Sequence, residues 1–320
     1  MTLTRSAKVI ETPVAIFIYN RPEHTSKLID ALSQFQFKNL IFIADGAKTE
    51  ADQINCLRAR ELVQKDWGCH VDYVVSDINL GCRNRVVSGL DFVFQNYESA
   101  IILEDDCIPA PTFFDFCELA LKRFEKNTEI LMACGTVLVE PRDYEYSYFY
   151  SKIPHIWGWA TWRDRWQKYP RKISDYQKFY ELEKQKSSMP EPFIWSLCDN
   201  LRRIEAEELD TWDFQMTYLG LSQNLLSVFP SKNLITNIGF DEKATHTKRV
   251  SILSDLCVGK FDEDIQHPPK NAVLIANDLD RMLLEGYAGR KWHRLIKVLM
   301  RKNGLFHAMD RVIQKIWINL

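Results

Sequence analysis

Four short apolar runs alternate with helix-length segments in the first 110 residues, and this alternation is the feature that most restricts the fold. The runs span residues 14–19, 40–44, 71–75 and 100–103, and the segments between them have helical composition or apolar residues at helical spacing. Strands that alternate with helices in this way form right-handed βαβ units around a parallel sheet. We therefore predict a nucleotide-binding-like α/β half at the N-terminus.

The pattern changes from residue 141 onward. Residues 144–162 are rich in tyrosine and tryptophan and show no regular alternation, while 172–209 are charged and helical in composition. A further helix is expected to open at 210–213, and 225–229 reads as a short strand. Acidic and proline-containing stretches at 262–269 indicate a linker before a basic C-terminal region.

Length and composition exclude several classes of protein. With 320 residues, 46% of them hydrophobic and 26% charged, the chain can bury a full core, and its net charge of -2 argues against a general nucleic-acid binder. The eight cysteines form no CxxC pair, so we expect reduced thiols rather than a zinc site or a disulfide scaffold. Neither a signal sequence nor a membrane-length apolar run is evident, and we expect a cytoplasmic protein.

Polar residues follow each predicted strand, and the last group is the most informative. Glu104, Asp105 and Asp106 come directly after the apolar run 100–103. Ligands of open α/β sheets bind outside the carboxyl ends of the strands. Adjacent carboxylates repel one another unless a cation neutralises them, and oxygen ligands favour Mg²⁺ or Mn²⁺. The alternative is an acidic turn that caps the helix expected from about residue 111.

The chain lacks the glycine-rich loops that usually hold phosphates, so a nucleotide would have to be bound by other groups. Asn20 and Arg21 after the first strand and Asp45 after the second suit a base and ribose pocket. Arg83 and Arg85 suit the neutralisation of a diphosphate. The alternatives are an ordinary turn residue for Asp45 and a solvated basic patch for the two arginines.

A longer match surrounds the acids. The stretch from Ser99 to Cys117, which reads SAIILEDDCIPAPTFFDFC, resembles the acid-motif strand and following helix of N-acetylglucosaminyltransferase I and related GT-A glycosyltransferases. The resemblance covers residues 13–140 well and 141–250 loosely. It implies an α/β GT-A fold with a mostly parallel central sheet flanked by helices. It also implies a nucleotide-sugar-binding half (1–140), an acceptor-binding and catalytic half (141–250) and a helical basic extension (251–320).

The resemblance also implies roles for the residues of the donor site. Asp106 would coordinate Mn²⁺ or Mg²⁺, while Glu104 and Asp105 would contact the donor sugar or ribose. Asp45 is similar to the aspartate that reads the uracil edge, and Arg83 or Arg85 would face the diphosphate. Asn20 and Arg21 complete the predicted donor-binding set.

A Trp-Asp segment downstream resembles the part of the family that carries the catalytic base. In this chain it is Trp212-Asp213, which makes Asp213 the candidate that deprotonates the acceptor hydroxyl. Asp210 competes for that role. The alternative for Asp213 is an acid that interacts favourably with the positive end of a helix.

Two further groups complete the predicted site. His246, in a polar loop after the last strand, is a candidate ligand of the metal or the diphosphate, or alternatively a solvent-exposed histidine. Trp157, Trp159 and Trp212 are candidates for a platform that stacks on the acceptor or the donor sugar. The spacing of Trp157, Trp159 and Trp162 does not place all three on one face, so we expect one or two of them to pack in the core instead.

The C-terminal segment is strongly basic. Residues 290–320 contain eight lysines and arginines against one acid, which leaves this segment at +7 and the remainder of the chain at -9. Its apolar residues have amphipathic helical spacing. Such a helix can lie on the anionic inner face of a membrane, or its apolar face can pack on the domain while the charges stay in water.

Together these features predict a metal-dependent glycosyltransferase. The resemblance implies an inverting mechanism, and a retaining mechanism is the alternative. The enzyme would move a hexose or N-acetylhexosamine from a nucleoside-diphosphate donor, a UDP-sugar in particular, to a hydroxyl of a glycan or lipid-linked saccharide during polysaccharide synthesis. The alternatives are a sugar nucleotidyltransferase and a non-catalytic glycan-binding protein of the same fold.

Overall fold

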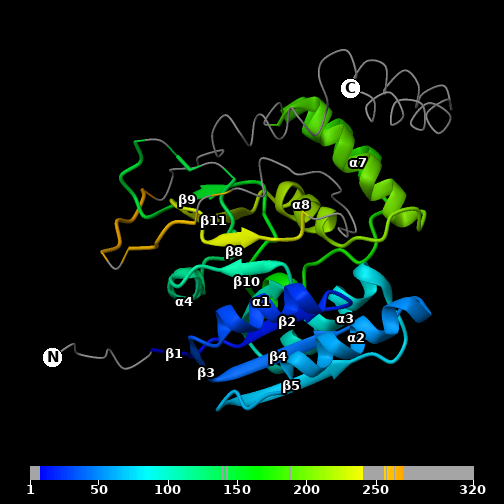
Figure 1. The fold of residues 1–320 in the computed structure, drawn as a ribbon. Helices are drawn as coiled ribbons and strands as arrows, with labels where there is room; N and C mark the ends of the chain where they lie inside the picture. The colour runs from blue at the N-terminus through cyan, green and yellow to red at the C-terminus, as the bar shows by residue number, and fades with distance from the viewer. Residues whose placement is uncertain are drawn as a thin grey trace, which may run out of the picture.

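The computed structural model describes residues 8–240 except 139, 142, 187 and 188, together with 256, 258–262 and 264–269. Most of the predicted C-terminal extension (251–320), including its basic segment 290–320, therefore lies outside the described residues. An eight-stranded sheet in the order β5-β4-β2-β6-β10-β8-β11-β9 runs through the molecule (Figure 1). The fold is the predicted α/β class, a mostly parallel central sheet flanked by helices.

The first four strands of this sheet are the four predicted apolar runs. They are β2 (Val14–Ile18), β4 (Asn39–Ala44), β5 (His70–Val75) and β6 (Ser99–Glu104), and all three of their pairings are parallel. From β2 the chain moves outward to β4 and β5, and then returns to place β6 on the other side of β2. This reversal between β2 and β6 is a topological switch point, where the ends of open sheets form a crevice.

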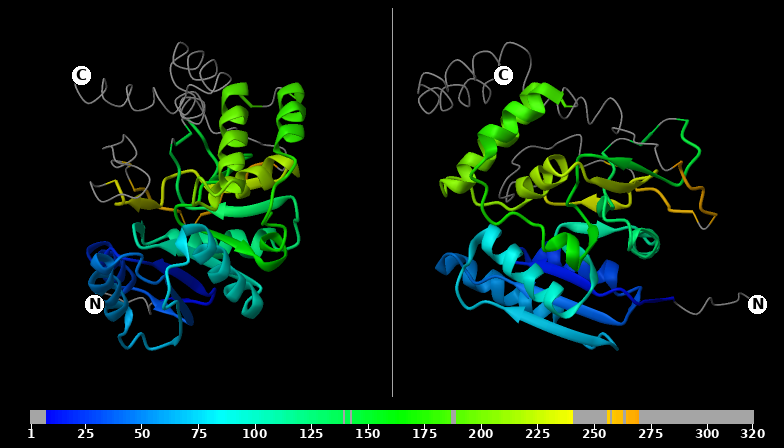
Figure 2. Two further views of the ribbon diagram at one scale, coloured as in Figure 1. Left: turned by 90° about the vertical axis from the view of Figure 1, so that its right-hand side faces the viewer. Right: turned by 180° about the vertical axis from the view of Figure 1, so that it is seen from behind.

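Strand residues alternate between two cores, one on each face of the sheet. Val14, Ile16 and Ile18 of β2 face a core shared with α1 (Pro22–Leu32) and α4 (Phe113–Phe124). Ala15 and Phe17 face a second core shared with α3 (Gly81–Asn96) and α8 (Asp213–Ser222). The helix α2 (Glu50–Val63) packs against α1, and the views from the side and from behind show helices on both faces (Figure 2).

The aromatic segment was predicted to be irregular, and this prediction was wrong. It contributes β9 (Tyr148–Ser151) at the edge of the sheet and β10 (Trp159–Trp162) in its interior, between β6 and β8 (Ile130–Cys134). Strand β10 runs antiparallel to both neighbours. Strand β11 (Leu226–Pro230) corresponds to the predicted strand 225–229 and lies between β8 and β9.

The charged stretch 172–209 forms two helices, α6 (Tyr176–Lys186) and α7 (Glu191–Glu205). Pro192 lies in the first turn of α7, where proline is tolerated because the N–H group that it lacks would have no partner within the helix. The two helices enclose a third, smaller core that also takes Leu221 from α8. They stand beyond the sheet on the side away from β5 (Figure 1).

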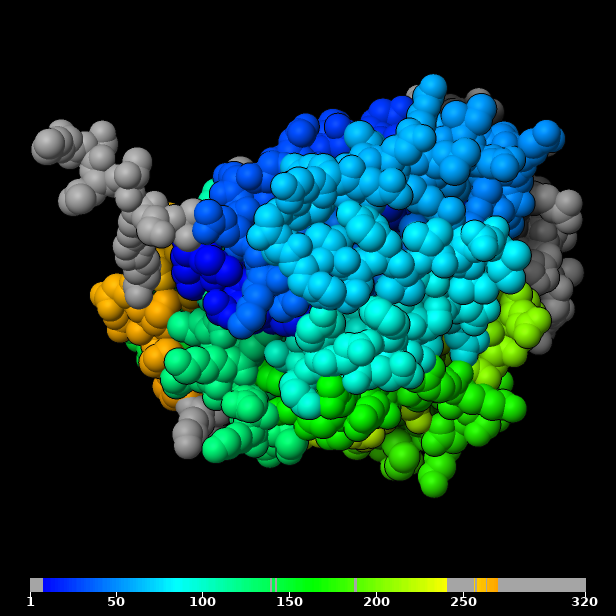
Figure 3. All heavy atoms as spheres, turned by 90° about the horizontal axis from the view of Figure 1, so that it is seen from below, coloured from blue at the N-terminus to red at the C-terminus, as the bar shows by residue number. Residues whose placement is uncertain are grey.

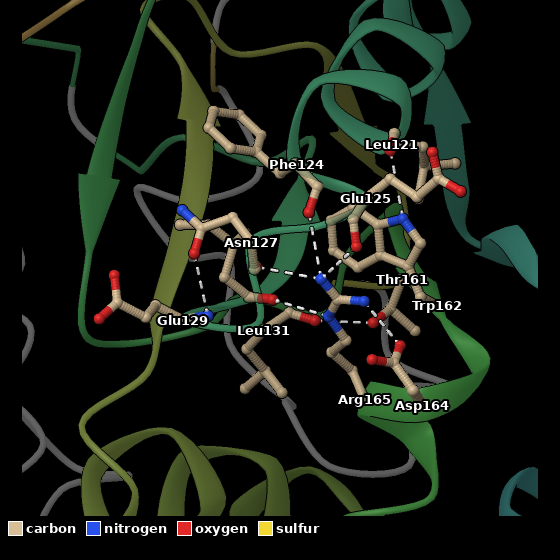
Figure 4. Close-up of polar contacts among 11 residues, drawn as sticks. Leu121, Phe124, Glu125, Asn127, Glu129, Leu131, Thr161, Trp162, Asp164 and Arg165 are labelled. Atoms are coloured by element: carbon tan, nitrogen blue, oxygen red, sulfur yellow. Dashed lines mark hydrogen bonds and ion pairs between the residues drawn. The ribbon is translucent and has the colours of Figure 1, made fainter. Parts of the chain in front are cut away.

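A buried arginine joins α4 to the short helix α5 (Arg163–Trp166). Arg165 is 2% exposed, and its guanidinium donates to the carbonyl oxygens of Phe124, Glu125 and Asn127 over 2.8–3.1 Å (Figure 4). These carbonyls follow the last turn of α4 and have no partner within the helix. The charge is balanced by Asp164 at 2.7 Å and by the ring of Trp162. Arg165 therefore fixes the C-terminal end of α4.

Two short sheets complete the fold. Strands β1 (Val9–Ile10) and β3 (Gln36–Phe37) pair in parallel, while β7 (Cys107–Pro109), directly after the three acids, pairs with β12 (Ile235–Asn237). Residues predicted to be a linker also pack on the domain. Gln266 N donates to Ser147 Oγ over 2.9 Å, and His267 lies against the ring of Tyr148. Phe261, just before the predicted linker, is buried against Phe116 of α4.

Candidate functional site

The three acids lie at the switch point of the sheet. Glu104, the last residue of β6, pairs in register with Phe17 of β2, so the acids stand beside the residues that follow β2. The sequence places Asn20 and Arg21 there. The arrangement follows from the apolar strands: both run in parallel, and each ends where its first polar residues begin.

Arg21 holds two of the acids together. One guanidinium nitrogen donates to Asp106 Oδ2 over 2.9 Å, and the other forms a short ion pair with Asp105 Oδ1. Asp105 is 2% exposed, and its second oxygen has no hydrogen-bond partner. Burial alone would lower the pKa of Arg21, but attraction to Asp105 and Asp106 outweighs it and raises the pKa. Arg21 is therefore a fixed positive charge inside the acid cluster.

One arginine does not neutralise three carboxylates. Burial, followed by repulsion from Asp106, raises the pKa of Glu104 to about 8. Burial also raises the pKa of Asp105 to about 6, even though the nearby Arg21 opposes the shift. Carboxyl groups resist ionisation in this way when negative charge is concentrated in a poorly solvated place. An additional cation at this position would relieve the repulsion.

The backbone of the loop after β12 lies close to Asp106. Ile238 N donates to the carbonyl of Asp106 over 2.9 Å, and a Cβ on Gly239 would collide with Asp106 Oδ2, so only glycine lets this backbone approach the carboxylate. Among the described residues, no group of three or more histidines, cysteines and acids is arranged to hold a metal ion. One carboxylate completed by substrate phosphates and water is a donor set that Mg²⁺ accepts. The residues present fit that kind of site.

The side chain of Asp45 is buried and fully occupied by protein groups. It accepts hydrogen bonds from the backbone of Gly46, Leu80 and Gly81 at 2.9–3.1 Å and from the amide of Asn79 at 3.1 Å. Asp45 therefore fixes the loop after β4 against the loop before α3. The contact of Asp45 with a uracil edge stays a prediction.

Asn20 and a tyrosine that the sequence analysis missed line the same edge. Asn20 donates to Asp52 of α2 over 2.7 Å. The hydroxyl of Tyr19 accepts from Lys48 N at 3.1 Å and from the amide of Asn79 at 3.3 Å. Tyr19 ends the first apolar run, and its position at a strand end is the signal that could have identified it.

The two arginines predicted to face a diphosphate are directed at backbone carbonyls. Arg83 donates to the carbonyl of Arg171 over 2.6 Å and lies 3.8 Å from Glu205. Arg85 is buried and donates to the carbonyl of Val74 over 2.7 Å. Both therefore connect α3 to neighbouring elements, and the structure shows neither bound to the acids.

The two candidates for the base are clearly distinguished. Both carboxylate oxygens of Asp210 accept backbone N–H groups, from Cys82 at 2.8 Å and Arg83 at 2.9 Å. Asp213 begins α8 and accepts a short hydrogen bond from the hydroxyl of Thr211. Its charge is one of the smaller contributions to the raised pKa of Glu104, after burial and Asp106. Asp213 therefore interacts electrostatically with Glu104, whereas Asp210 binds the backbone of α3.

For two of the three predicted platform tryptophans, Trp159 and Trp212, the prediction was wrong. Trp159 is fully buried and Trp212 is 2% exposed, and their rings stack with centroids 5.6 Å apart. Neither presents a ring face to a ligand. Trp157 stays partly exposed and contacts the ring of Phe240, which follows Gly239. Trp157 is thus the remaining candidate for a sugar platform, while His246 lies outside the described residues.

Comparisons with known proteins add little to this geometry. No protein-family model and no curated protein matches the sequence. Within the described ranges, no helix has the length and apolarity needed to cross a membrane.

Three solved structures show partial similarity to this chain. The mannosyltransferase PcManGT from Pyrobaculum calidifontis, in complex with GDP-Man and Mn²⁺, has a TM-score of 0.38 and 12% identity over 75% of this chain and 59% of its own. The chain therefore spans less than two thirds of that mannosyltransferase. A UDP-glucose pyrophosphorylase complexed with UDP-glucose has a TM-score of 0.35 and 5% identity over 69% of this chain and 90% of its own.

The third, HddC from Yersinia pseudotuberculosis, has a TM-score of 0.29 and 15% identity over 51% of this chain and 83% of its own. Similarities at these TM-scores do not assign a function to this chain. None of the three is an N-acetylglucosaminyltransferase I, so the resemblance to that family stays a prediction.

Proposed function

We propose that this protein is a metal-dependent glycosyltransferase that moves a sugar from a nucleoside-diphosphate donor to a hydroxyl group of a glycan or lipid-linked saccharide. One observation carries the proposal. The cluster of Glu104, Asp105 and Asp106 lies at the switch point of the sheet, carries more negative charge than Arg21 neutralises, and lies within electrostatic range of Asp213. The division into a donor half (1–140) and an acceptor half (141–250) is part of the same proposal.

In this mechanism the donor diphosphate approaches Asp106. A Mg²⁺ or Mn²⁺ ion at Asp106 would supply charge that stabilises the departing nucleoside diphosphate. Asp105 stays paired with Arg21 and orients the cluster, while Glu104 faces the sugar or ribose hydroxyls. Tyr19, Asn20 and Asn79 form the edge against which the base and ribose would lie, and Asp45 acts indirectly by holding that edge in place.

Asp213 is the proposed base. It accepts the proton of the acceptor hydroxyl as that oxygen bonds to the anomeric carbon, and the bond from this carbon to the diphosphate oxygen breaks with its electrons. A single displacement inverts the anomeric configuration and needs no covalent intermediate. Trp157 is the proposed surface on which the acceptor stacks.

A sugar nucleotidyltransferase would use a related fold, but two features weigh against it. The chain has no glycine- and basic-rich loop after β2, where Tyr19-Asn20-Arg21-Pro22 stands instead. The backbone N–H groups at the start of α3 are also not available to a substrate phosphate, because they already donate to Asp45 and Asp210.

A thermal-shift screen of nucleoside diphosphates with and without Mn²⁺ tests the proposal. We expect stabilisation by one nucleoside diphosphate, UDP in particular, that requires Mn²⁺ and is lost in Asp106→Ala. Stabilisation by nucleoside triphosphates alone would favour the nucleotidyltransferase. No response to any nucleotide would favour a glycan-binding protein without catalytic activity.

A further inference from the structure

The first turn of α3 is held by two aspartates from distant parts of the chain. A helix start leaves its first N–H groups without partners inside the helix. Asp45 accepts those of Leu80 and Gly81, and Asp210 accepts those of Cys82 and Arg83. Asp45 follows β4, whereas Asp210 comes from the segment between α7 and α8. The same helix turn therefore ties the predicted donor half to the predicted acceptor half.

Gly81 makes this approach sterically possible. Its φ of +80° lies in the left-handed region, and a Cβ at this position would lie 2.5 Å from Asp210 Oδ2. Any side chain here would both strain the backbone and displace the carboxylate. Gly81 and Asp210 thus form a close contact, here called the joint, between α3 and the segment that precedes α8.

Arg83 and Tyr169 make further hydrogen bonds near this joint. The guanidinium of Arg83 donates to the carbonyl of Arg171 at 2.6 Å and, more weakly, to that of Ile204 at 3.5 Å, near the end of α7. The hydroxyl of Tyr169 donates to the carbonyl of Trp212 over 3.0 Å. In the view from below, the cyan atoms of α3 border the green atoms of the later part of the chain (Figure 3).

Asp213 follows this joint by three residues. Between them, Trp212 stacks on Trp159 of β10, and β10 pairs with the acid-bearing strand β6. The position of Asp213 relative to Glu104 is therefore set by the buried ring of Trp212 and by the carboxylate of Asp210. Near-attack geometry is sensitive to displacements of about 1 Å.

We infer that Asp210 is a positioning residue: by binding the Cys82 and Arg83 N–H groups it fixes the segment that presents Asp213 to the acid cluster. This inference rests on the proposed function for the role of Asp213. Asp210 itself touches neither substrate nor the reacting atoms, because both of its oxygens are committed to the backbone of α3.

A double-mutant cycle in transfer activity tests the inference. Asp210→Ala should lower kcat by about 100-fold, the effect of an approximately 1 Å misplacement, while the KM for the donor changes by less than about threefold. In an Asp213→Asn background, Asp210→Ala should change kcat by less than about threefold. Residue 213 no longer acts as a base there, so its displacement has no further effect on the rate. The inference would be overturned if Asp210→Ala lowered kcat by the same factor in both backgrounds. It would also be overturned if the KM for the donor rose by as large a factor as kcat fell.

Two further variants keep the test interpretable. Asp210→Asn retains one acceptor oxygen and should recover part of the lost kcat. Asp66→Ala removes a comparable aspartate that accepts from the Gly68 N–H at 2.9 Å in an exposed turn, and it should leave kcat unchanged. Equal losses in Asp66→Ala and Asp210→Ala would contradict a specific role for Asp210.

Hydrogen exchange separates this inference from the proposed function. In Asp210→Ala the amides of residues 82, 83 and 211–214 should exchange faster, whereas those of β4 should not. If the wild-type protein transfers no sugar but Asp210→Ala still speeds exchange at these amides, the proposed function fails and the joint between α3 and Asp210 stands. Unchanged exchange at 211–214 would overturn the joint itself.

Discussion

Arg21 donates a hydrogen bond to Asp106 Oδ2 over 2.9 Å, and this contact links the end of β2 to the end of β6 at the switch point of the sheet. The same guanidinium also pairs with the buried Asp105. The acid cluster is thus partly neutralised from within the chain, and Asp106 is the member that lies closest to Gly239 and the β12 loop.

Removal of Asp106 should abolish binding that depends on a metal. We expect Asp106→Ala to lower transfer by at least about 100-fold, the magnitude typical for the loss of a group that stabilises a departing charge. Calorimetric titration with UDP should show no gain in affinity on addition of Mn²⁺. Asp115→Ala, which changes an exposed acid of α4 paired with Lys8, is the matched control and should bind as the wild type does. A variant Asp106→Ala that keeps Mn²⁺-dependent affinity would contradict the assignment.

Removal of Arg21 should destabilise the fold. Arg21→Gln leaves Asp105 buried without its counter-ion, and breaking a buried pair of this kind costs about 3 kcal/mol or more in the free energy of unfolding. The loss in the free energy of unfolding should be smaller at pH 5, where Asp105 can take up a proton. Urea denaturation of the variant and the wild type at pH 5 and pH 7 measures this loss. Arg171→Gln breaks the exposed pair with Asp91 and should cost less than about 1 kcal/mol; equal costs in the two variants would contradict a structural role for the Arg21 pair.

The stability of the nucleotide-free protein should fall as the pH rises. The pKa values of Asp105 and Glu104 are raised to about 6 and about 8, above their ordinary values of 3.8 and 4.5. A carboxyl with a raised pKa contributes fully below its unfolded pKa, and that contribution is lost as the pH passes through the folded value. The free energy of unfolding should therefore decline between pH 5 and pH 8.

Glu104→Gln isolates the part of this decline that Glu104 causes. The variant should lose less stability than the wild type between pH 6.5 and pH 8.5, as measured by urea denaturation at each pH. Because Glu104 keeps some exposed surface, solvent moderates the effect. If the free energy of unfolding declined equally with pH in the two proteins, the pKa of Glu104 would not be raised by its surroundings.

Two tryptophans should respond in opposite ways. Trp212→Ala empties a buried site and should lower the free energy of unfolding by about 3–5 kcal/mol. Trp157→Ala, at a partly exposed position, should cost less stability but raise the KM for the acceptor several-fold. Denaturation and acceptor kinetics on both variants test this contrast. Trp157 is not the acceptor platform if its removal leaves the acceptor KM unchanged.

Substitution of Gly239 should affect the carboxylate more than the fold. In Gly239→Ala the new methyl group must displace Asp106 Oδ2, so the affinity for UDP with Mn²⁺ should drop while the melting temperature changes little. Gly220→Ala is the control, because a Cβ there meets its nearest neighbour at an ordinary 3.5 Å. A larger effect on stability than on affinity would contradict the proposed geometry.

The strands and acids at the N-terminal side could be predicted because their signals are local. Each apolar run ends at a polar residue, and parallel pairing brings those ends together. Strand β10 could not be predicted, because four residues rich in tryptophan carry no periodicity of their own. Their strand conformation comes from antiparallel pairing with β6 and β8, more than 20 residues away in sequence.

The roles of individual charged residues were harder to predict for the same reason. Arg83, Arg85 and Asp210 have unremarkable local sequences, and only the folded chain shows that they bind backbone groups of distant segments. The start of α3 at Gly81 also depends on Asp45 and Asp210. The helix expected to open at 210–213, by contrast, does begin at Asp213.

The most direct test of the central claim is to identify the phosphorus-containing product. The protein is incubated with UDP-sugars, Mn²⁺ and a mixture of saccharide acceptors, and the products are followed by phosphorus NMR. The account predicts that the nucleoside diphosphate accumulates only when an acceptor is present and that Asp213→Asn suppresses it. Pyrophosphate-dependent conversion of the donor to a nucleoside triphosphate, or turnover that survives loss of both Asp106 and Asp213, would contradict it.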